Sequence, residues 1–260
     1  MAQFTRNAAG AASTALPAAL QSLPMSSNFL APTASELERD WGLVLDDGWQ
    51  TDVAGGDQAP IIRRFGVGEA AQREAVLARF GLIPTNAKAA RSPNSSLNAR
   101  SETAATRSTF KNAFAHRQWC IIPAQCIYVP YYAEGAKRAE RWRIRRNDRS
   151  PLCIAGLWDR WVDEHGREIV SFAMLTINCD LHPLLNRFDR KLNEKGEPAE
   201  KRTPVLLAEE DFDEWLDASP TRAPIYFGTF GKDDLDAEPA PSPTRRATSI
   251  MPLDTTISEF

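Results

Sequence analysis

The chain carries a series of short β-rich runs with no alternation of strand and helix between them, and this order narrows the possible folds most. The runs are rich in β-branched and aromatic residues and are bounded by Gly, Pro or polar clusters, which is typical of strands. They lie at residues 120–132, 140–146, 151–162, 168–179 and 203–207. Such a succession predicts an α+β domain with a curved, largely antiparallel sheet or barrel.

Helices are expected only at the flanks of this sheet. Residues Thr33–Trp41 supply cap residues followed by a short helical stretch. Residues Glu69–Arg79 carry small and apolar side chains at helical spacing, and Glu209–Leu216 is expected to form a closing helix. We therefore expect a single domain in which helices flank a sheet or barrel.

The two ends of the chain differ in composition from its middle. Residues 1–24 contain no acidic residue, and Ser13, Thr14 and Pro17 interrupt the apolar run that a secretory signal needs. We expect a disordered extension there, or residues read from a misassigned upstream start. Residues 231–260 are rich in Pro, Ser and Thr and are expected to form a poorly ordered arm or one that wraps the surface. The compact domain is therefore expected over residues 25–230.

Composition argues against several classes of function. A net charge of −3, from 31 basic and 34 acidic residues, gives the whole molecule no attraction for nucleic acid, so such binding requires a local basic face. No apolar run approaches the ~20 residues of a membrane span. The three histidines have no acids or cysteines at ligand spacing, so we expect neither a metal nor another cofactor. Four cysteines in apolar surroundings indicate reduced core thiols and a cytoplasmic protein.

One predicted strand has the character of a nucleic-acid surface. In the sequence RWRIR, arginine alternates with apolar residues, so the guanidinium groups share one face while Trp142 and Ile144 point into the core. The arginines are Arg141, Arg143 and Arg145. Three guanidinium groups on one face could follow a phosphate backbone. The alternative interpretation is a solvated strand face whose charge is offset by acidic residues nearby.

A polar motif, LNARSET, occupies Leu97–Thr103. Its closely spaced polar residues do not suit a hydrophobic core, so they indicate a functional segment. FGLIP precedes it, and CIIPAQCIYVP, AGLWDRW, SFAMLTIN and EKRTPVLLAEEDFDEWL follow it in that order. In order and spacing these motifs resemble the SRAP family, the SOS response-associated peptidases, over residues Met25–Leu216. The resemblance implies a single SRAP-like domain that acts in the DNA-damage response.

The resemblance also bears on the beginning of the domain. Family members begin Met-Cys, and PMSSNF at residues 24–29 resembles that beginning displaced by an extension. In the family, the amine of the exposed cysteine forms an imine with the aldehyde of an abasic site in single-stranded DNA, and its thiol then closes a thiazolidine ring. Here Ser26 occupies the cysteine position. Its hydroxyl is a far weaker nucleophile and would close a labile oxazolidine.

The other functional positions of the family can be located one at a time. The resemblance implies that Asn98 lies beside the nucleophile and that Arg100 approaches a DNA phosphate. The glutamate that assists proton transfer falls on Val129, which cannot transfer a proton. The histidine that opens a His-x-Arg-Met-Pro-Val run falls on Glu200, with Asp189 as the alternative if the gap in the alignment lies elsewhere.

Two functions of different classes follow from these positions. We expect a monomer that binds single-stranded DNA at abasic sites through Arg100 and the basic strand face, with covalent trapping lost because three of four chemical positions are altered. The alternative is an active SRAP-type enzyme with peptidase or crosslinking activity, in which removal of the extension exposes Ser26 and Glu200 acts as a base. The structural alternatives are a loop-capping role for Asn98 and an ion pair of Arg100 with Glu102 or another carboxylate.

Overall fold

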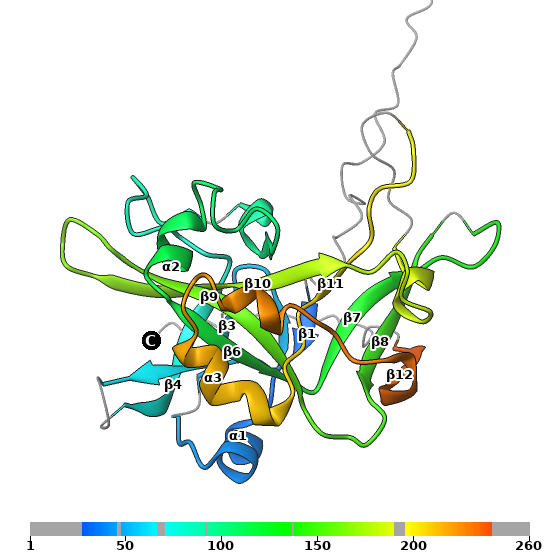
Figure 1. The fold of residues 1–260 in the computed structure, drawn as a ribbon, viewed down its shortest axis with the longest axis horizontal. Helices are drawn as coiled ribbons and strands as arrows, with labels where there is room; N and C mark the ends of the chain where they lie inside the picture. The colour runs from blue at the N-terminus through cyan, green and yellow to red at the C-terminus, as the bar shows by residue number, and fades with distance from the viewer. Residues whose placement is uncertain are drawn as a thin grey trace, which may run out of the picture.

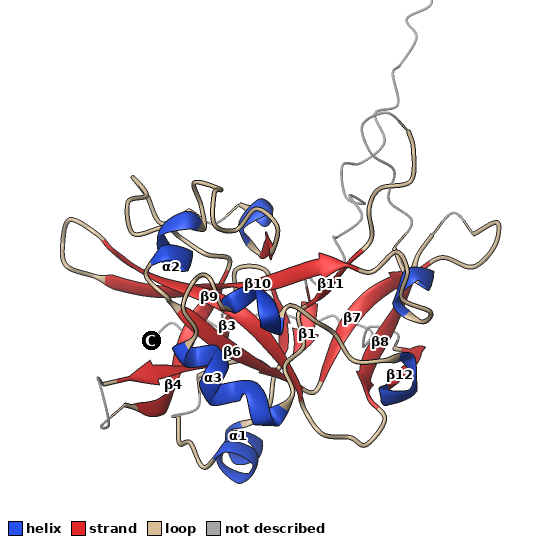
Figure 2. Cartoon of the chain, viewed as in Figure 1, coloured by secondary structure: helices blue, strands red, loops and turns tan. Residues whose placement is uncertain are grey.

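Two β-sheets form the part of the chain that this computed structural model describes, which is residues 28–45, 48–66, 71–91, 93–136, 138–189 and 196–240 (Figure 1, Figure 2). The seven-stranded sheet has the order β11 (Arg202–Pro204), β10 (Glu168–Asn178), β4 (Gln72–Phe80), β3 (Gln58–Phe65), β6 (Trp119–Ala124) and β9 (Leu152–Val162), with β5 (Asn98–Arg100) beside β10. The five-stranded sheet has the order β12 (Leu235–Pro239), β8 (Glu140–Arg146), β7 (Cys126–Tyr131), β1 (Asn28–Leu30) and β2 (Asp52–Ala54).

The larger sheet closes on itself through β9 and β10. Strand β9 pairs with β6 on one side and with β10 on the other. Strand β10 pairs in turn with β4, β4 with β3, and β3 with β6. Among the described strands, β10 runs parallel to β4 and β5, and the other pairings are antiparallel. This ring confirms the predicted α+β fold with a curved, largely antiparallel barrel core.

Side chains of the barrel strands alternate between two buried clusters, as the period of two in a strand requires. On β10, Phe172 and Met174 belong to the first cluster, whereas Ala173 and Leu175 belong to the second. The first cluster also contains Phe29 of the smaller sheet, so it joins the two sheets.

The second cluster lies under the helices. These are α1 (Ala34–Trp41), α2 (Lys111–Ala115) and α3 (Phe212–Asp217). Leu37 of α1, Phe114 of α2 and Trp215 of α3 are buried in it. The helices therefore cover the barrel wall on the side away from the first cluster.

Two of the predicted helices are confirmed. Helix α1 begins after Thr33, whose hydroxyl accepts a hydrogen bond from the Glu36 backbone nitrogen at 3.3 Å, while the Glu36 carboxylate accepts one from the Thr33 nitrogen at 2.8 Å. This is the capping box that the sequence indicated. The closing helix expected at Glu209–Leu216 is present as a 3₁₀ turn followed by α3.

The helix predicted over Glu69–Arg79 is wrong, because this segment forms most of β4. Strand β4 pairs with β3 from Gln72 to Arg79 and with β10 at Arg79 and Phe80. Its adjacent residues Ala75 and Val76 pack against different buried clusters, as neighbours on a strand do. Apolar side chains that contact a cluster on each face leave no alternation of polar and apolar residues, so the sequence carried no strand signal there.

Strand β12 lies inside the segment that the sequence set apart as a C-terminal arm. It adds to the edge of β8, with Leu235 opposite Arg146 and Pro239 opposite Trp142. Leu235 is buried in the first cluster. Residues 1–24 and 241–260 lie outside the described residues.

The described residues include all four cysteines, and each is buried and unpaired. Burial raises the pKa of the Cys153 thiol to about 12, so it is protonated at neutral pH. None of the described helices has the length and apolar character needed to cross a membrane.

Gly156 of β9 lies where β6, β9 and β10 crowd together, so we predict that Gly156→Ala destabilises the barrel. A Cβ atom there would lie 2.9 Å from the Ala173 carbonyl oxygen and 2.8 Å from Ile122 Cδ1. Overpacking of this kind typically lowers the free energy of unfolding by about 1–3 kcal/mol, which urea denaturation measures. The matched control is Gly228→Ala, where no atom lies within 4 Å of the new Cβ, and a change within about 0.5 kcal/mol is expected. Equal stability of both variants would contradict this account of barrel closure.

Candidate functional site

Two short strands flank the C-terminal half of β10 and bring the polar motifs together. Strand β5 runs parallel to β10, with Asn98 opposite Met174 and Arg100 opposite Thr176. On the other edge, β11 pairs antiparallel, with Arg202 opposite Asn178. Segments separated by about a hundred positions in the sequence are therefore adjacent at one end of β10.

Arg202 is the centre of a network of charges at this end. Its guanidinium group donates to Glu200 at 2.6 Å, to Glu102 at 2.7 Å and to the Thr176 carbonyl oxygen at 2.6 Å. The Arg202 side chain is only 13% exposed, so these contacts replace its water. Partial burial alone would raise the pKa of Glu102, but the Arg202 hydrogen bond and the nearby positive charges hold it below its ordinary value.

Glu200, the predicted counterpart of the family histidine, is an acceptor in this network. Besides Arg202, its carboxylate accepts from the Asn178 amide at 3.0 Å and lies 3.6 Å from the Arg100 guanidinium. Arg100 is 56% exposed, so it is the more accessible of the two arginines around Glu200. Of the carboxylates that the sequence left open as partners of Arg100, the structure therefore gives Glu200, whereas Glu102 contacts Arg202 at 2.7 Å. Neither Asn178 nor Arg202 was assigned a role from sequence, although Arg202 belongs to the EKRTPV motif.

Asn98 carries an unsatisfied polar atom. Its Oδ1 is buried, and among the described residues no donor lies within hydrogen-bond distance of it. Most buried polar atoms in proteins have a hydrogen-bond partner, so an exception suggests a role other than stability. No loop-capping bond to Oδ1 is formed by the described chain.

The other predicted positions lie around the first buried cluster. Val129 of β7 is 2% exposed and belongs to it, as do Leu97, which precedes Asn98, and Phe188, which precedes Asp189. The Asp189 backbone nitrogen donates to the Pro130 carbonyl oxygen at 3.0 Å, beside Val129. Asp189 and Glu200, the two alternatives for one family position, are thus held by different strands, β7 and β10.

Ser26 lies outside the described residues. The described part of β1 begins two residues later at Asn28, which is opposite Tyr128 and so adjacent to Val129 in the β7 register.

The arginines of β8 share one face, as predicted, but each has an acidic partner. Arg141 contacts Asp52 of β2 at 2.9 Å and lies over the Tyr128 ring, with 3.4 Å between its Cζ and the ring centroid. Arg143 and Arg145 each contact Glu238 of β12 at 2.7 Å. Their neighbours Trp142 and Ile144 pack on the first cluster, which confirms the predicted alternation. Part of the offsetting charge comes from strands β2 and β12, which the sequence did not identify as neighbours.

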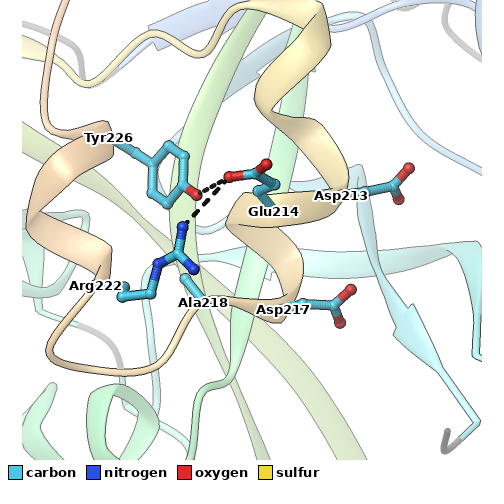
Figure 3. Close-up of a pocket in the computed structure, with 6 residues that line it drawn as sticks. All are labelled: Asp213, Glu214, Asp217, Ala218, Arg222 and Tyr226. Carbon is cyan, nitrogen blue, oxygen red and sulfur yellow. Dashed lines mark hydrogen bonds and ion pairs between the residues drawn. The ribbon is translucent and has the colours of Figure 1, made fainter.

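A separate hollow lies between α3 and the 3₁₀ turn Ala223–Tyr226. Figure 3 shows the Tyr226 hydroxyl and the Arg222 guanidinium both directed at Glu214, at 2.8 Å and 3.6 Å. The two other acids of the lining, Asp213 and Asp217, form ion pairs with Arg64. None of the predicted site residues is among those that line this hollow. In the described part of the chain, no cluster of three or more His, Cys, Asp and Glu side chains could hold a metal ion.

Comparisons with known proteins match this fold and these motifs. A model of the family described as "SOS response associated peptidase (SRAP)" matches residues 30–239. The chain is 29% identical over 163 residues to the abasic site processing protein YobE of Bacillus subtilis, which covers 61% of this chain and 67% of that protein. It is 28% identical over 163 residues to the abasic site processing protein YoqW of the same organism, covering 61% and 66%. The chain thus spans about two thirds of the length of these relatives.

Solved structures share the fold. A crystal structure of a protein from Bordetella bronchiseptica has a TM-score of 0.70 and 33% identity, covering 82% of this chain and 99% of that one. A protein from Bacteroides thetaiotaomicron has a TM-score of 0.65 at 21% identity, covering 83% and 91%, and shows the fold alone.

The unsatisfied oxygen of Asn98 leads to a stability prediction. Asn98→Ala removes no hydrogen bond to Oδ1, so the free energy of unfolding should change by less than about 1 kcal/mol. Asn178→Ala is the matched control on the neighbouring strand, because it removes bonds to Asp180 and Glu200 and should cost about 1 kcal/mol more. Thermal and urea denaturation measure both. A larger loss for Asn98→Ala than for Asn178→Ala would show that the Asn98 side chain supports the fold.

Proposed function

The chain belongs to the SRAP family, and from that premise we propose that it binds single-stranded DNA at abasic sites without durable covalent trapping. The names of its relatives, which are abasic site processing proteins, support an abasic site as the lesion that it binds. The observation that carries the proposal is that β5 holds an exposed Arg100 two residues after Asn98. The buried Oδ1 of Asn98 has no hydrogen-bond partner in the described chain. Phosphate contacts by arginine position a nucleic acid, and a buried amide oxygen without a partner suggests a role other than stability for Asn98 beside that contact.

The proposed loss of covalent trapping rests on three side chains. Ser26 supplies no thiol to close a thiazolidine ring on an imine. Val129 is buried in an apolar cluster and has no proton to transfer. Glu200 accepts hydrogen bonds from Arg202 and Asn178, which occupies its carboxylate with structural contacts. General acid–base partners are typically worth roughly 10²–10⁴ in rate, so replacement of several together favours binding without reaction.

The basic face of β8 extends the proposed DNA surface. Arg141, Arg143 and Arg145 are partly exposed, but each shares its charge with an acid. We propose that Arg100 supplies the first phosphate contact and that the β8 arginines add to it. A cytoplasmic monomer is part of the same proposal.

Arg100→Ala should weaken binding to single-stranded DNA. Loss of one phosphate contact reduces the salt dependence, lowering the slope of log K against log[salt] by about 0.7 in magnitude. Fluorescence anisotropy over a salt series measures both quantities. Because Arg100 is exposed and its ion pair is long, thermal stability should change little.

The matched control for Arg100 is Arg160→Ala. Arg160 is 55% exposed and pairs with Glu168 near the β9–β10 hairpin, so the two variants lose the same charge at side chains of nearly equal exposure. This variant should bind as the unaltered chain does. Equal affinity and slope for a folded Arg100→Ala variant would reject the assignment.

Restoring the family groups should restore covalent capture. A chain beginning at Met25 with Ser26→Cys, Val129→Glu and Glu200→His would present an amine and a thiol on one residue after Met removal. The amine condenses with the abasic aldehyde with loss of water, and the thiol adds to the imine carbon. A heat-stable band on a denaturing gel with abasic single-stranded DNA is expected from this chain and not from the original.

Two controls make this experiment decisive. A buried unpaired carboxylate at Val129 could cost several kcal/mol, so circular dichroism must first show that the altered chain is folded. A heat-stable adduct from the original chain would contradict the proposed loss of trapping. No adduct from a folded, DNA-binding altered chain would contradict the assignment of Ser26, Val129 or Glu200, and Asp189→His would then replace Glu200→His.

A further inference from the structure

The outer face of the five-stranded sheet carries a ladder of alternating charges. Strand β12 places Asp236 opposite Arg145 and Glu238 opposite Arg143, so acids and arginines face each other across the β8–β12 pair. On the other side of β12, Leu235 and Ala237 pack on the first cluster. The acids of β12 are therefore directed to the outer face by the same alternation that buries its apolar residues.

Glu238 is shared between two guanidinium groups. Its Oε1 atom lies 2.7 Å from a terminal nitrogen of Arg143 and 2.7 Å from one of Arg145. The Glu238 side chain is 38% exposed and that of Arg143 is 39% exposed, so solvent reaches this contact. One oxygen held by two converging arginines is also how a phosphate oxygen can be bound.

Because the two arginines are already positioned around one carboxylate oxygen, they need no rearrangement to bind a phosphate oxygen in its place. Exposed ion pairs contribute little to stability, so breaking the contact with the carboxylate to bind a phosphate has a small free-energy cost. The remaining charges around Glu238 are Asp236, also acidic, and Arg149, whose positive charge acts on Glu238. The hydrogen bond from Arg143 and the positive charges of Arg143, Arg145 and Arg149 hold the pKa of Glu238 below its ordinary value, so Glu238 is ionised at neutral pH.

We propose that Glu238 is an internal competitor for the DNA backbone: it occupies Arg143 and Arg145 in the free protein and is displaced by a phosphate of single-stranded DNA. This inference rests on the proposed function and adds a regulation of the same surface. The net charge of the ladder formed by Arg141, Arg143, Arg145, Asp52, Asp236 and Glu238 is zero. Affinity for the backbone is therefore limited by the acids and not by the number of arginines.

Glu238→Gln tests the proposal, because it keeps the size of the side chain and removes its charge. This variant should bind a thymidine oligonucleotide that carries one abasic site about threefold to tenfold more tightly than the original chain does at low salt. Its slope of log K against log[salt] should be steeper by about 0.7. Removing both arginines as well, with Arg143→Ala and Arg145→Ala, should abolish the gain. Fluorescence anisotropy over a salt series measures all of these.

The matched control is Glu168→Gln, which changes the net charge equally. Glu168 is 50% exposed and pairs with Arg160 at the β9–β10 hairpin, far from β12 in Figure 1. This variant should bind as the original chain does. A gain equal to that of Glu238→Gln would assign the effect to net charge and overturn the proposal.

The other outcomes separate the two proposals. If the original chain and Glu238→Gln bind single-stranded DNA with equal affinity and slope, the competitor role is wrong while DNA binding stands. If folded protein of both kinds fails to bind, the proposed function is wrong, and this inference with it. Polyglutamate serves as an anion without a phosphate backbone. If Glu238→Gln increases the affinity for polyglutamate as much as the affinity for DNA, the arginines bind anions in general and the proposed role of the DNA backbone is wrong.

Discussion

Strand β10 is hydrogen-bonded along its two edges to β9, β4, β5 and β11, and the rest of the described fold depends on these pairings. Its residues Glu168–Met174 pair with β9 and close the barrel, which requires the close approach of β9 at Gly156. Its second half extends beyond the ring and holds two short strands. Because these strands carry the polar motifs, the same element that closes the core also positions the candidate site, and a rigid strand places side chains more precisely than a loop does.

Charge pairing is the second constraint on this molecule. Arg202 is enclosed by Glu102 and Glu200, and Arg143 and Arg145 share Glu238, so many guanidinium groups are matched by acids from other strands. Exposed ion pairs typically stabilise a fold by about 0.2–1 kcal/mol each. Their larger effect is on the electrostatic potential that a DNA backbone would meet. An acidic protein can therefore present arginines whose availability depends on which anion occupies them.

Part of this fold was predictable because its signals are local. The capping box at Thr33 and Glu36 lies within one turn of chain, and α1 begins where it indicates. The alternation of arginine with Trp142 and Ile144 is likewise local, and it correctly predicted which side of β8 is buried. The prediction for β4 was wrong for the converse reason. Ala75 and Val76 are both apolar but pack against different clusters, and a strand with apolar contacts on both faces shows no alternation of polar and apolar residues.

The candidate site divides in the same way. The sequence by itself determined the family and the succession of strands, because these are carried by short contiguous motifs. The assignment of Asn98, Arg100, Val129 and Glu200 to the family positions stays a prediction from the same motifs. Only the tertiary structure decided that the oxygen of Asn98 has no donor in the described chain and that the β8 arginines are paired. The acids that pair them, Asp52 and Glu238, lie 89 and 95 positions away from Arg141 and Arg143. Contacts at such separations are set by strand order and register, which follow from how the whole core packs and which no local pattern records.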